Sequence, residues 1–265
     1  MPDQYSHFPR VILNVAIRRL TIDKFFGSEK EGVGVDIQDR QPSYIHVCKR
    51  SDPQLENCII NSIESLRPYL LKGIPELQVP PIEPLRLPEV VVAQGGGIKA
   101  VGKDVDVGGP GSFIIKKLKL HEYPDKYEID IGVDLPFLTF DGQYEVNGRL
   151  LVVPLNGKGP VHANATDCKA DVVLHAQLVK RKNARYLHFN AMDIDLYIGN
   201  YYVKLENLFN GDRLLGDATN AALNENQKEF INYLKPIIET TVGNVILEIA
   251  NRITQSFDFD TLLPE

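Results

Sequence analysis

The sequence predicts an α+β protein in which a long, curved antiparallel β-sheet is wrapped around a long C-terminal α-helix. Apolar residues recur at helical spacing through the last part of the chain. In the middle of the chain, apolar and polar residues alternate with a period of two, and a shorter amphipathic segment precedes this region. A long antiparallel meander between a short helix and a long helix is typical of the α+β class.

The predicted C-terminal helix spans residues 224–256 and has an unusually wide apolar surface. A first stripe at helical spacing consists of Ile231, Leu234, Ile238, Val242, Val245 and Ile249. A second row beside it consists of Phe230, Ile237, Thr241, Ile246, Ala250 and Ile253. Together these rows exceed the single apolar face that a surface helix needs. We therefore expect other parts of the chain to cover this helix on several sides.

The middle of the chain predicts strands, with the clearest alternation at residues 129–133, 172–178 and 194–198. Four turn signals are expected to separate strands here: Gly108 to Gly111, Asp141-Gly142, Asn156-Gly157 and Gly199-Asn200. Their spacing favours antiparallel hairpins over strand-helix-strand units. This region therefore predicts one antiparallel sheet.

A short helix is predicted before the sheet, with Ile59, Ile63, Leu66 and Leu70 on one face. It follows Ser51-Asp52-Pro53, a capping signal, and Gly73 and Pro75 end it. Residues 77–89 are rich in proline, which excludes a regular helix and disfavours a central strand. We expect an extended connector at an edge of the sheet.

Residues 1–40 are expected to form a weakly ordered N-terminal extension, and residues 41–265 the folded domain. The short apolar run at residues 11–17 contains Asn14 and is followed by Arg18 and Arg19. No small-residue cleavage site comes after it, so the segment does not predict a signal peptide.

Composition excludes several classes of partner. The formal net charge is −6 and the pI is about 5.6, whereas nucleic-acid binding requires a basic surface that neutralises phosphates. No apolar run reaches the roughly 18 residues of a membrane-spanning helix. We expect a monomer that binds no nucleic acid and has no transmembrane segment.

The sequence offers no catalytic or metal-binding signature. The six histidines lack the spacing of metal ligands, and the Gly-x-Ser-x-Gly motif of a serine nucleophile is missing. Acidic residues alternate with apolar ones, as expected of outward positions on strands. We therefore expect neither enzymatic activity, nor a metal, nor a cofactor.

Cys48 and Cys58 bracket a short loop at the start of the first helix. In an oxidising compartment they would form a disulfide, and in a reducing one they would remain two buried thiols. Asn164-Ala165-Thr166 is a potential glycosylation site at Asn164 and slightly favours the oxidising alternative. Cys168 is left over and is expected to be a free thiol.

Two long motifs resemble the insect takeout and juvenile-hormone-binding protein family. The first is Cys48-Lys-Arg-Ser-Asp-Pro-x-Leu-x-x-Cys58, followed by Ile74-Pro-Glu-Leu and the proline-rich connector. The second is Leu205-x-Asn-Leu-Phe-Asn-Gly-Asp-x-x-Leu-Gly-Asp217, followed by Asn220, Leu223-Asn-Glu-Asn226 and Leu234-x-Pro236. The chain departs from the family in lacking a clear signal peptide, and in having Gln227 where the family has an aromatic residue.

The resemblance implies a tubular lipid-binding fold with an internal apolar tunnel, a Cys48–Cys58 disulfide and a secreted protein. It also implies a non-catalytic carrier of a small hydrophobic ligand, such as a juvenile-hormone-like terpenoid or a fatty-acid-like molecule. The alternative is a secreted interaction or signalling protein whose cavity is filled, because aliphatic residues suit a tunnel wall and a packed core equally well. The expected tunnel lining comprises Ile63, Leu66, Leu70, Val133, Leu151, Val173, Leu196, Leu234, Ile238 and Val242.

Overall fold

The structure is a computed structural model that describes residues 44–95 and 97–265. The expected N-terminal extension, residues 1–40, lies outside the described residues, and the domain boundary at residue 41 stays a prediction.

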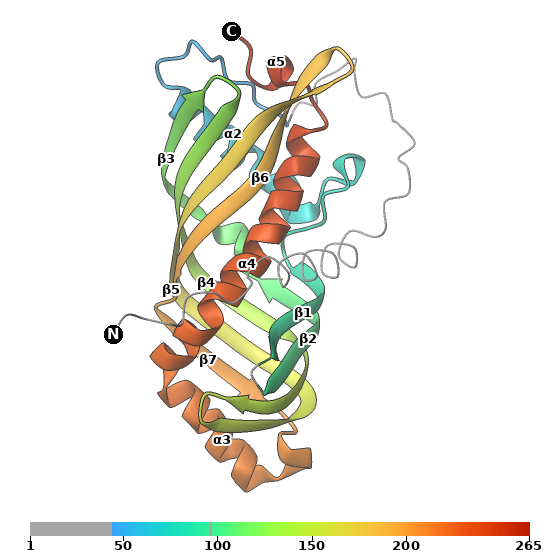
Figure 1. Ribbon diagram of the computed structural model, residues 1–265, viewed down its shortest axis with the longest axis vertical. Coiled ribbons are helices and arrows are strands. Elements are labelled where there is room, and N and C mark those ends of the chain that lie inside the picture. The colour runs from blue at the N-terminus through green and yellow to red at the C-terminus, as the bar shows by residue number, and fades with distance from the viewer. Residues whose placement is uncertain (1–43, 96) are drawn as a thin grey trace, which may run out of the picture.

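A curved antiparallel sheet and a long helix dominate the fold, and the predicted α+β class is confirmed (Figure 1). The helices are α2 (Leu55–Lys72), α3 (Arg213–Glu225), α4 (Gln227–Thr254) and α5 (Phe259–Leu262), with short 3-10 turns η1 (Pro75–Leu77), η2 (Pro110–Ser112) and η3 (Phe209–Gly211). The strands are β1 (Leu85–Gly95), β2 (Ile98–Gly108), β3 (Ile114–Tyr123), β4 (Lys126–Leu150), β5 (Val153–Arg181), β6 (Ala184–Tyr197) and β7 (Asn200–Leu205).

Two long central strands, β4 and β5, run the length of the sheet and pair with each other throughout. The outer edge of β4 pairs with β3 near one end and with β2 near the other, and β1 continues the sheet beyond β2. The outer edge of β5 pairs with β6 and then with β7. Among the described residues the sheet is not closed, and α4 contacts both β6 and β1, so the helix lies between its two margins (Figure 1).

Two expected turns are wrong, because β4 and β5 continue through Asp141-Gly142 and Asn156-Gly157. The glycines there serve close packing within the sheet instead. A Cβ atom on Gly142 would lie 3.0 Å from Cα of Val105, and one on Gly157 would lie 3.0 Å from Cα of Leu208. Glycine inside a strand thus marks a close approach of another backbone segment. The expected turn at Gly108 to Gly111 is present, as the 3-10 turn η2 between β2 and β3. The expected turn at Gly199-Asn200 is wrong as well, because β6 and β7 follow the same edge of β5 in the same direction and only the pairing is interrupted there.

In β5, the set of alternate residues that faces inward changes at Asp167. Alternate residues of a strand share a face, yet the buried residues Ala165 and Cys168 are three positions apart. Asp167 between them has φ of +54°, which interrupts the regular extended backbone. The neighbour of β5 changes from β7 to β6 at this same point. The two halves of β5 therefore turn residues of opposite parity inward.

Within residues 44–95 and 97–265, the buried apolar residues form three clusters rather than one core. The lower core joins β1, β2, β4, β5, α3 and the start of α4, around Tyr144, Leu208 and Phe230. The upper core joins β4, β5, β6, α5 and the end of α4, around Tyr127, Phe189 and Phe259. A third cluster, the α2 core, joins α2, η1 and the last turns of α4, around Ile74.

The free edge of β7 is covered by side-chain amides from the helices. Asn224 binds both backbone groups of Val203, accepting from its N–H and donating to its C=O at 2.8 Å each. Asn220 makes the same pair of bonds with Leu205, at 2.9 Å. Asn220 and Asn224 are one helical turn apart, and Val203 and Leu205 are two residues apart on the strand. The two amides therefore reach successive backbone positions of β7 whose N–H and C=O groups point away from β5. These amides therefore replace the backbone of a missing neighbouring strand.

Helix α4 covers the edge of β6 in the same way. Asn251 accepts from the N–H of Phe189 and donates to its C=O, each at 2.8 Å. At the middle of the helix, the carboxylate of Glu239 accepts from the N–H of Leu196 at 2.8 Å. An unpaired edge of a sheet is prone to aggregation, and these contacts satisfy it within the chain.

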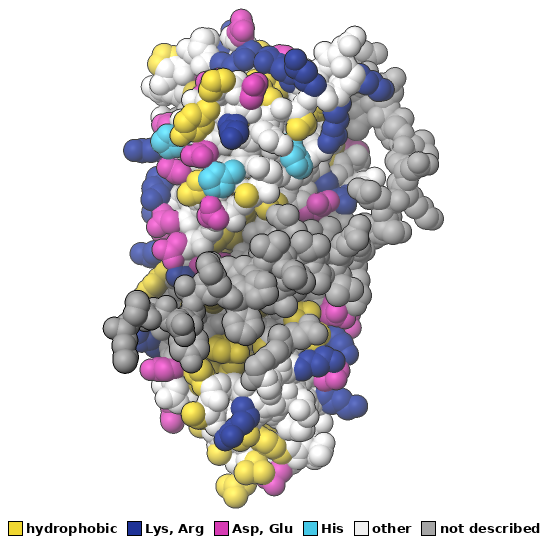
Figure 2. Space-filling model, viewed as in Figure 1, with side chains coloured by type: hydrophobic (Ala, Val, Ile, Leu, Met, Phe, Trp, Pro, Cys, Tyr) yellow, Lys and Arg dark blue, Asp and Glu magenta, His cyan; other side chains and the backbone are white. Residues whose placement is uncertain are grey.

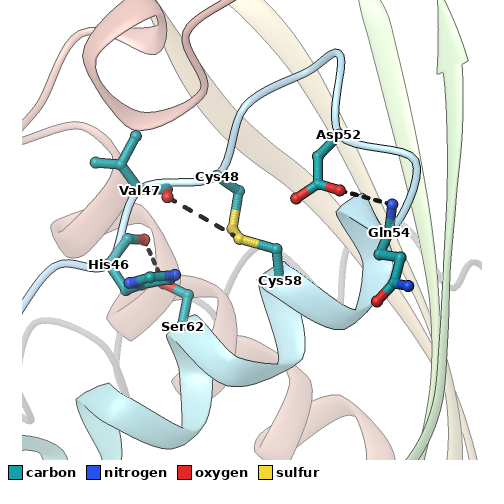
Figure 3. Close-up of a disulfide and its surroundings, with 7 residues drawn as sticks. All are labelled: His46, Val47, Cys48, Asp52, Gln54, Cys58 and Ser62. Carbon is teal, nitrogen blue, oxygen red and sulfur yellow. Dashed lines mark hydrogen bonds between the residues drawn. A yellow bond between two sulfur atoms is a disulfide. The ribbon is translucent and has the colours of Figure 1, made fainter.

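The Cys48–Cys58 disulfide ties the chain before α2 to the first turn of that helix (Figure 3). Ser62 donates to the C=O of His46 at 2.7 Å, one turn further along the helix. The carboxylate of Asp52 accepts from the N–H of Gln54 at 2.8 Å just before the helix begins. The predicted bridge is thus present, and Cys168 is free and buried in β5.

We predict that Asn224→Ala lowers the free energy of unfolding by about 2–3 kcal/mol, because both backbone groups of Val203 lose their partner. Urea denaturation measures the change. Asn226→Ala is the matched control, since the amide of Asn226 is exposed and donates only to the C=O of Ala222. Equal effects of the two substitutions would show that the β7 edge does not depend on its amide.

Cys168 should resist alkylation in the native protein, because burial raises the pKa of its thiol and shields it from reagent. Iodoacetamide without reductant should modify no cysteine in the folded chain and only Cys168 after unfolding. Peptide mapping identifies the modified residues. Modification of Cys48 or Cys58 without reductant would contradict the disulfide.

Candidate functional site

The inner face of α4 is packed at both ends. Leu234 packs against the lower core. Near the other end of the helix, Ile249 and Ile253 pack against the α2 core, while Leu247 is buried in the upper core. The helix is therefore anchored above and below, and the residues between these anchors decide whether the interior is filled.

Val242 and Ile246 remain accessible between the anchors, with 42% and 39% of their surface exposed. They lie seven residues before Ile249 and Ile253, and a spacing of seven places residues on the same side of a helix. Val245, three residues after Val242, is buried, so accessibility differs between neighbouring positions of the helix. The inner face of α4 thus carries accessible apolar surface between two packed regions.

A row of three apolar residues crosses the sheet at the same level. Ala170 of β5 pairs with Val133 of β4 and with Leu196 of β6, so the three share one face. That face is the inner one, because Ala170 packs against the upper core. The N–H of Leu196 is the one bound by Glu239, which fixes this row opposite the middle of α4.

Four of the expected lining residues therefore lie at one level of the molecule, Val133 and Leu196 on the sheet and Ile238 and Val242 on α4. Ile238 is one turn before Val242 and is half-buried. The other expected helix residues belong to packed regions. Leu234 packs against the lower core, Leu66 packs against the α2 core and Leu70 is buried in it. Ile63, one turn before Leu66, is half-buried.

Two expected lining residues lie elsewhere. Val173 stands between Val172 and Leu174, which are both buried in the upper core, so alternation turns its side chain to the outer face of the sheet. Leu151 occupies the tight turn between β4 and β5, where its side chain is nearly half exposed. Neither residue belongs to the interior opposite α4.

Ala170 and Ile246 belong to this region but were absent from the expected lining. The alternation through Val172 and Leu174 extends back to Ala170 and could have identified it. Its small side chain leaves room at the centre of the row. Ile246 lies one turn after Val242, so the helical period also predicted its position.

The chemistry of this region is that of apolar contact. Val133, Ala170, Leu196, Ile238, Val242 and Ile246 are all aliphatic and carry no titratable group. In the lower core, the hydroxyl of Tyr144 donates to the C=O of Glu206 at 2.6 Å, and burial raises its pKa to about 12. The hydroxyl of Tyr201 donates to the C=O of Leu223 at 2.6 Å, and burial raises its pKa likewise. Both phenols are therefore neutral and already bonded at physiological pH.

Among the described residues, one cluster has the geometry to hold a metal ion, formed by His46, Cys48 and Cys58. Its two sulfur atoms form the disulfide, so no thiolate is left to bind a metal. Within residues 44–95 and 97–265, no helix combines the length and the apolar character needed to cross a bilayer.

A polar groove of about 490 Å³ lies beside the C-terminal half of α4, on a different side of the helix from Val242. It is lined by Glu76, Leu77, Gln78, His188, Glu248, Asn251, Arg252, Gln255 and Ser256. Arg252 binds Glu248 at 2.8 Å and Gln78 at 2.8 Å, and Gln255 contacts His188 at 2.7 Å. These groups satisfy one another, which makes the groove a poor match for an apolar ligand.

Asn164 lies within β5, paired with Thr139 of β4 and Tyr202 of β7. Its neighbour Ala165 is buried, so alternation places Asn164 on the outer face, where it is half-buried. Glycosylation at Asn164 stays a prediction.

Comparison with known proteins gives relatives across nearly the whole chain. The circadian clock-controlled protein daywake of Drosophila melanogaster is 25% identical over 235 residues, which cover 85% of this chain and 89% of that protein. A putative beta-carotene-binding protein of Schistocerca gregaria is 22% identical over 221 residues, covering 83% and 88%.

The fold itself matches the crystal structure of Takeout 1 of Epiphyas postvittana. The TM-score is 0.70 at 20% identity, and the match covers 83% of this chain and all of that one. Residues 31–264 match the family described as haemolymph juvenile hormone binding protein (JHBP). The curved sheet, the long helix and this match over nearly the whole chain show that the protein belongs to the JHBP family.

Proposed function

We propose that the protein binds and carries a small hydrophobic, lipid-like molecule, a juvenile-hormone-like terpenoid or a fatty-acid-like compound, in a tunnel between α4 and the sheet. The observation that carries the proposal is the exposure of Val242 and Ile246 on the inner face of α4, between two packed cores. Free energy is lowered when a ligand covers apolar surface inside the protein and removes it from water, so such surface favours binding.

The opposing row on the sheet supports the proposal. Val133, Ala170 and Leu196 offer a second aliphatic wall, and α4 is held level with it by the bond from Leu196 to Glu239. An elongated apolar ligand could touch both walls along its length. The aliphatic residues of both walls carry no titratable group, which favours binding over chemical conversion of the ligand.

The relatives support the same class of ligand. The family description names juvenile hormone, and the relative from Schistocerca gregaria is named for beta-carotene, both of which are hydrophobic isoprenoids. The family description also names haemolymph. Together with the Cys48–Cys58 disulfide, this supports an extracellular location for the protein.

Purified protein should yield a hydrophobic compound in stoichiometric amount when it is extracted with organic solvent and the extract is analysed by mass spectrometry. Protein stripped in this way should then bind a fluorescent long-chain probe. An empty extract together with no probe binding would instead support an interaction or signalling protein whose interior is filled.

Val242→Phe should weaken probe binding several-fold while leaving the melting temperature nearly unchanged, because the ring enters open space. Val245→Phe is the matched control, since it places the same ring three residues away at a buried position. Overpacking a filled core costs about 1–3 kcal/mol, so this control should lower the melting temperature. A large loss of stability in Val242→Phe with unchanged probe binding would show that Val242 packs against protein.

A further inference from the structure

Large aliphatic side chains are exposed at the lower end of the molecule, in two segments distant in sequence. Leu151 and Val152 form the turn between β4 and β5, and Val152 is 81% exposed. Leu214 and Leu215 lie in the first turn of α3, and Leu214 is 82% exposed. Both segments adjoin the lower core, and hydrophobic side chains are visible at this end, around α3 (Figures 1 and 2).

The residues of the β4–β5 turn are unfavourable both for the backbone conformation of the turn and for exposure to water. Leu150 pairs with Val153, which leaves Leu151 and Val152 as a two-residue turn. Leu151 has φ of +55°, whereas that of Val152 is not positive, the pattern of a type II′ turn, in which glycine is favoured at the first position. A branched aliphatic residue in the left-handed region is strained, and exposing it adds a hydration cost. Local stability therefore does not explain this choice of residues.

An exposed arginine lies within two residues of each exposed aliphatic pair. The chain reads Arg149-Leu150-Leu151 before the turn and Arg213-Leu214-Leu215 at the start of α3. Within the described part of the chain, neither Arg149 nor Arg213 forms an ion pair. A guanidinium that lacks a carboxylate partner is free to bind phosphate, for which its planar fork of donors is well suited.

We propose that this end of the molecule docks on the surface of a phospholipid membrane. Leu151, Val152, Leu214 and Leu215 enter the boundary between headgroups and acyl chains, and Arg149 and Arg213 bind lipid phosphates beside them. Aliphatic residues flanked by basic ones are the usual composition of a surface that lies in a lipid interface. Two short protruding segments can enter lipid individually, whereas a protein partner would need a surface shaped to fit both.

The proposal is tested by sedimenting the full chain with phosphatidylcholine vesicles, alone or mixed with phosphatidylglycerol. The wild-type protein should bind both, and more tightly when the anionic lipid is present. Leu151→Gly combined with Val152→Asn should weaken binding by roughly tenfold or more, since two inserted side chains are lost. The same double variant should melt at a higher temperature, because glycine fits the turn, so weakened binding cannot be attributed to unfolding.

Leu214→Glu tests the second segment and should also weaken binding, while an acidic residue in the first turn of α3 favours the helix. Tyr123→Ser is the matched control, since Tyr123 is an exposed aromatic residue at the β3–β4 turn, near the upper core, and its loss should leave binding unchanged. Arg149→Gln with Arg213→Gln should weaken binding most for the anionic vesicles and remove its salt dependence.

Wild-type protein that fails to sediment with either vesicle would overturn the proposal. Turn and α3 variants that bind vesicles as the wild type does would also overturn it. So would variants that alter only the oligomeric state on gel filtration, because the exposed aliphatic residues would then contact a second copy of the chain. Docking and ligand carriage have separate readouts, because probe binding by Val242→Phe is measured without vesicles.

Discussion

The structure depends on how the open edge of its sheet is satisfied. In the part of the chain that the structure describes, the strongly curved sheet has seven strands and does not close, which leaves backbone groups on β6 and β7 without a neighbouring strand. Asn220, Asn224 and Asn251 supply both a donor and an acceptor to that edge, in the geometry that a peptide group would provide. Because these amides sit on α3 and α4, satisfying the edge also fixes where the helices lie. The position of α4 over the sheet follows from this hydrogen bonding.

This attachment explains how a long apolar helix can have accessible residues on its inner face. A helix over a sheet is ordinarily held by filling the space between the two. Here Glu239 and Asn251 hold the flank of α4 to β6, and the packed regions at either end of the helix supply apolar burial. The segment that carries Val242 and Ile246 therefore need not pack tightly for the helix to keep its place.

Local sequence patterns predicted the elements better than they predicted which way side chains point. The wide apolar surface of α4 and the alternation through Val172 and Leu174 were sufficient for the helix and the sheet. Val173 was assigned to the wrong face because it is apolar and adjoins two buried residues, and only pairing and burial show its orientation. The change of face near Asp167 follows from a left-handed residue where β5 exchanges neighbours, which alternation alone does not reveal.

Leu151 shows a different limit. The residues at its turn lack the Asn-Gly or Gly signal that marks a hairpin, so an apolar run of four residues reads as a strand interior. Conversely, Gly142 and Gly157 look like turns but allow close backbone packing inside long strands. Asn220 and Asn224 lie within the family motif, yet their role depends on Val203 and Leu205. These strand residues are distant in sequence and are brought to the amides only by the fold.

The separation of the apolar residues into distinct cores has an evolutionary consequence. Substitutions within a single continuous core are felt throughout it, because close-packed side chains transmit changes in volume. Here two of the packed clusters lie toward the two ends, and Val242 and Ile246 between them are accessible and contribute less to burial. Mutations in that middle section can accumulate with little loss of stability, which allows related proteins to diverge in their interiors. The persistence of the fold at 20% identity to Takeout 1 is in keeping with this freedom.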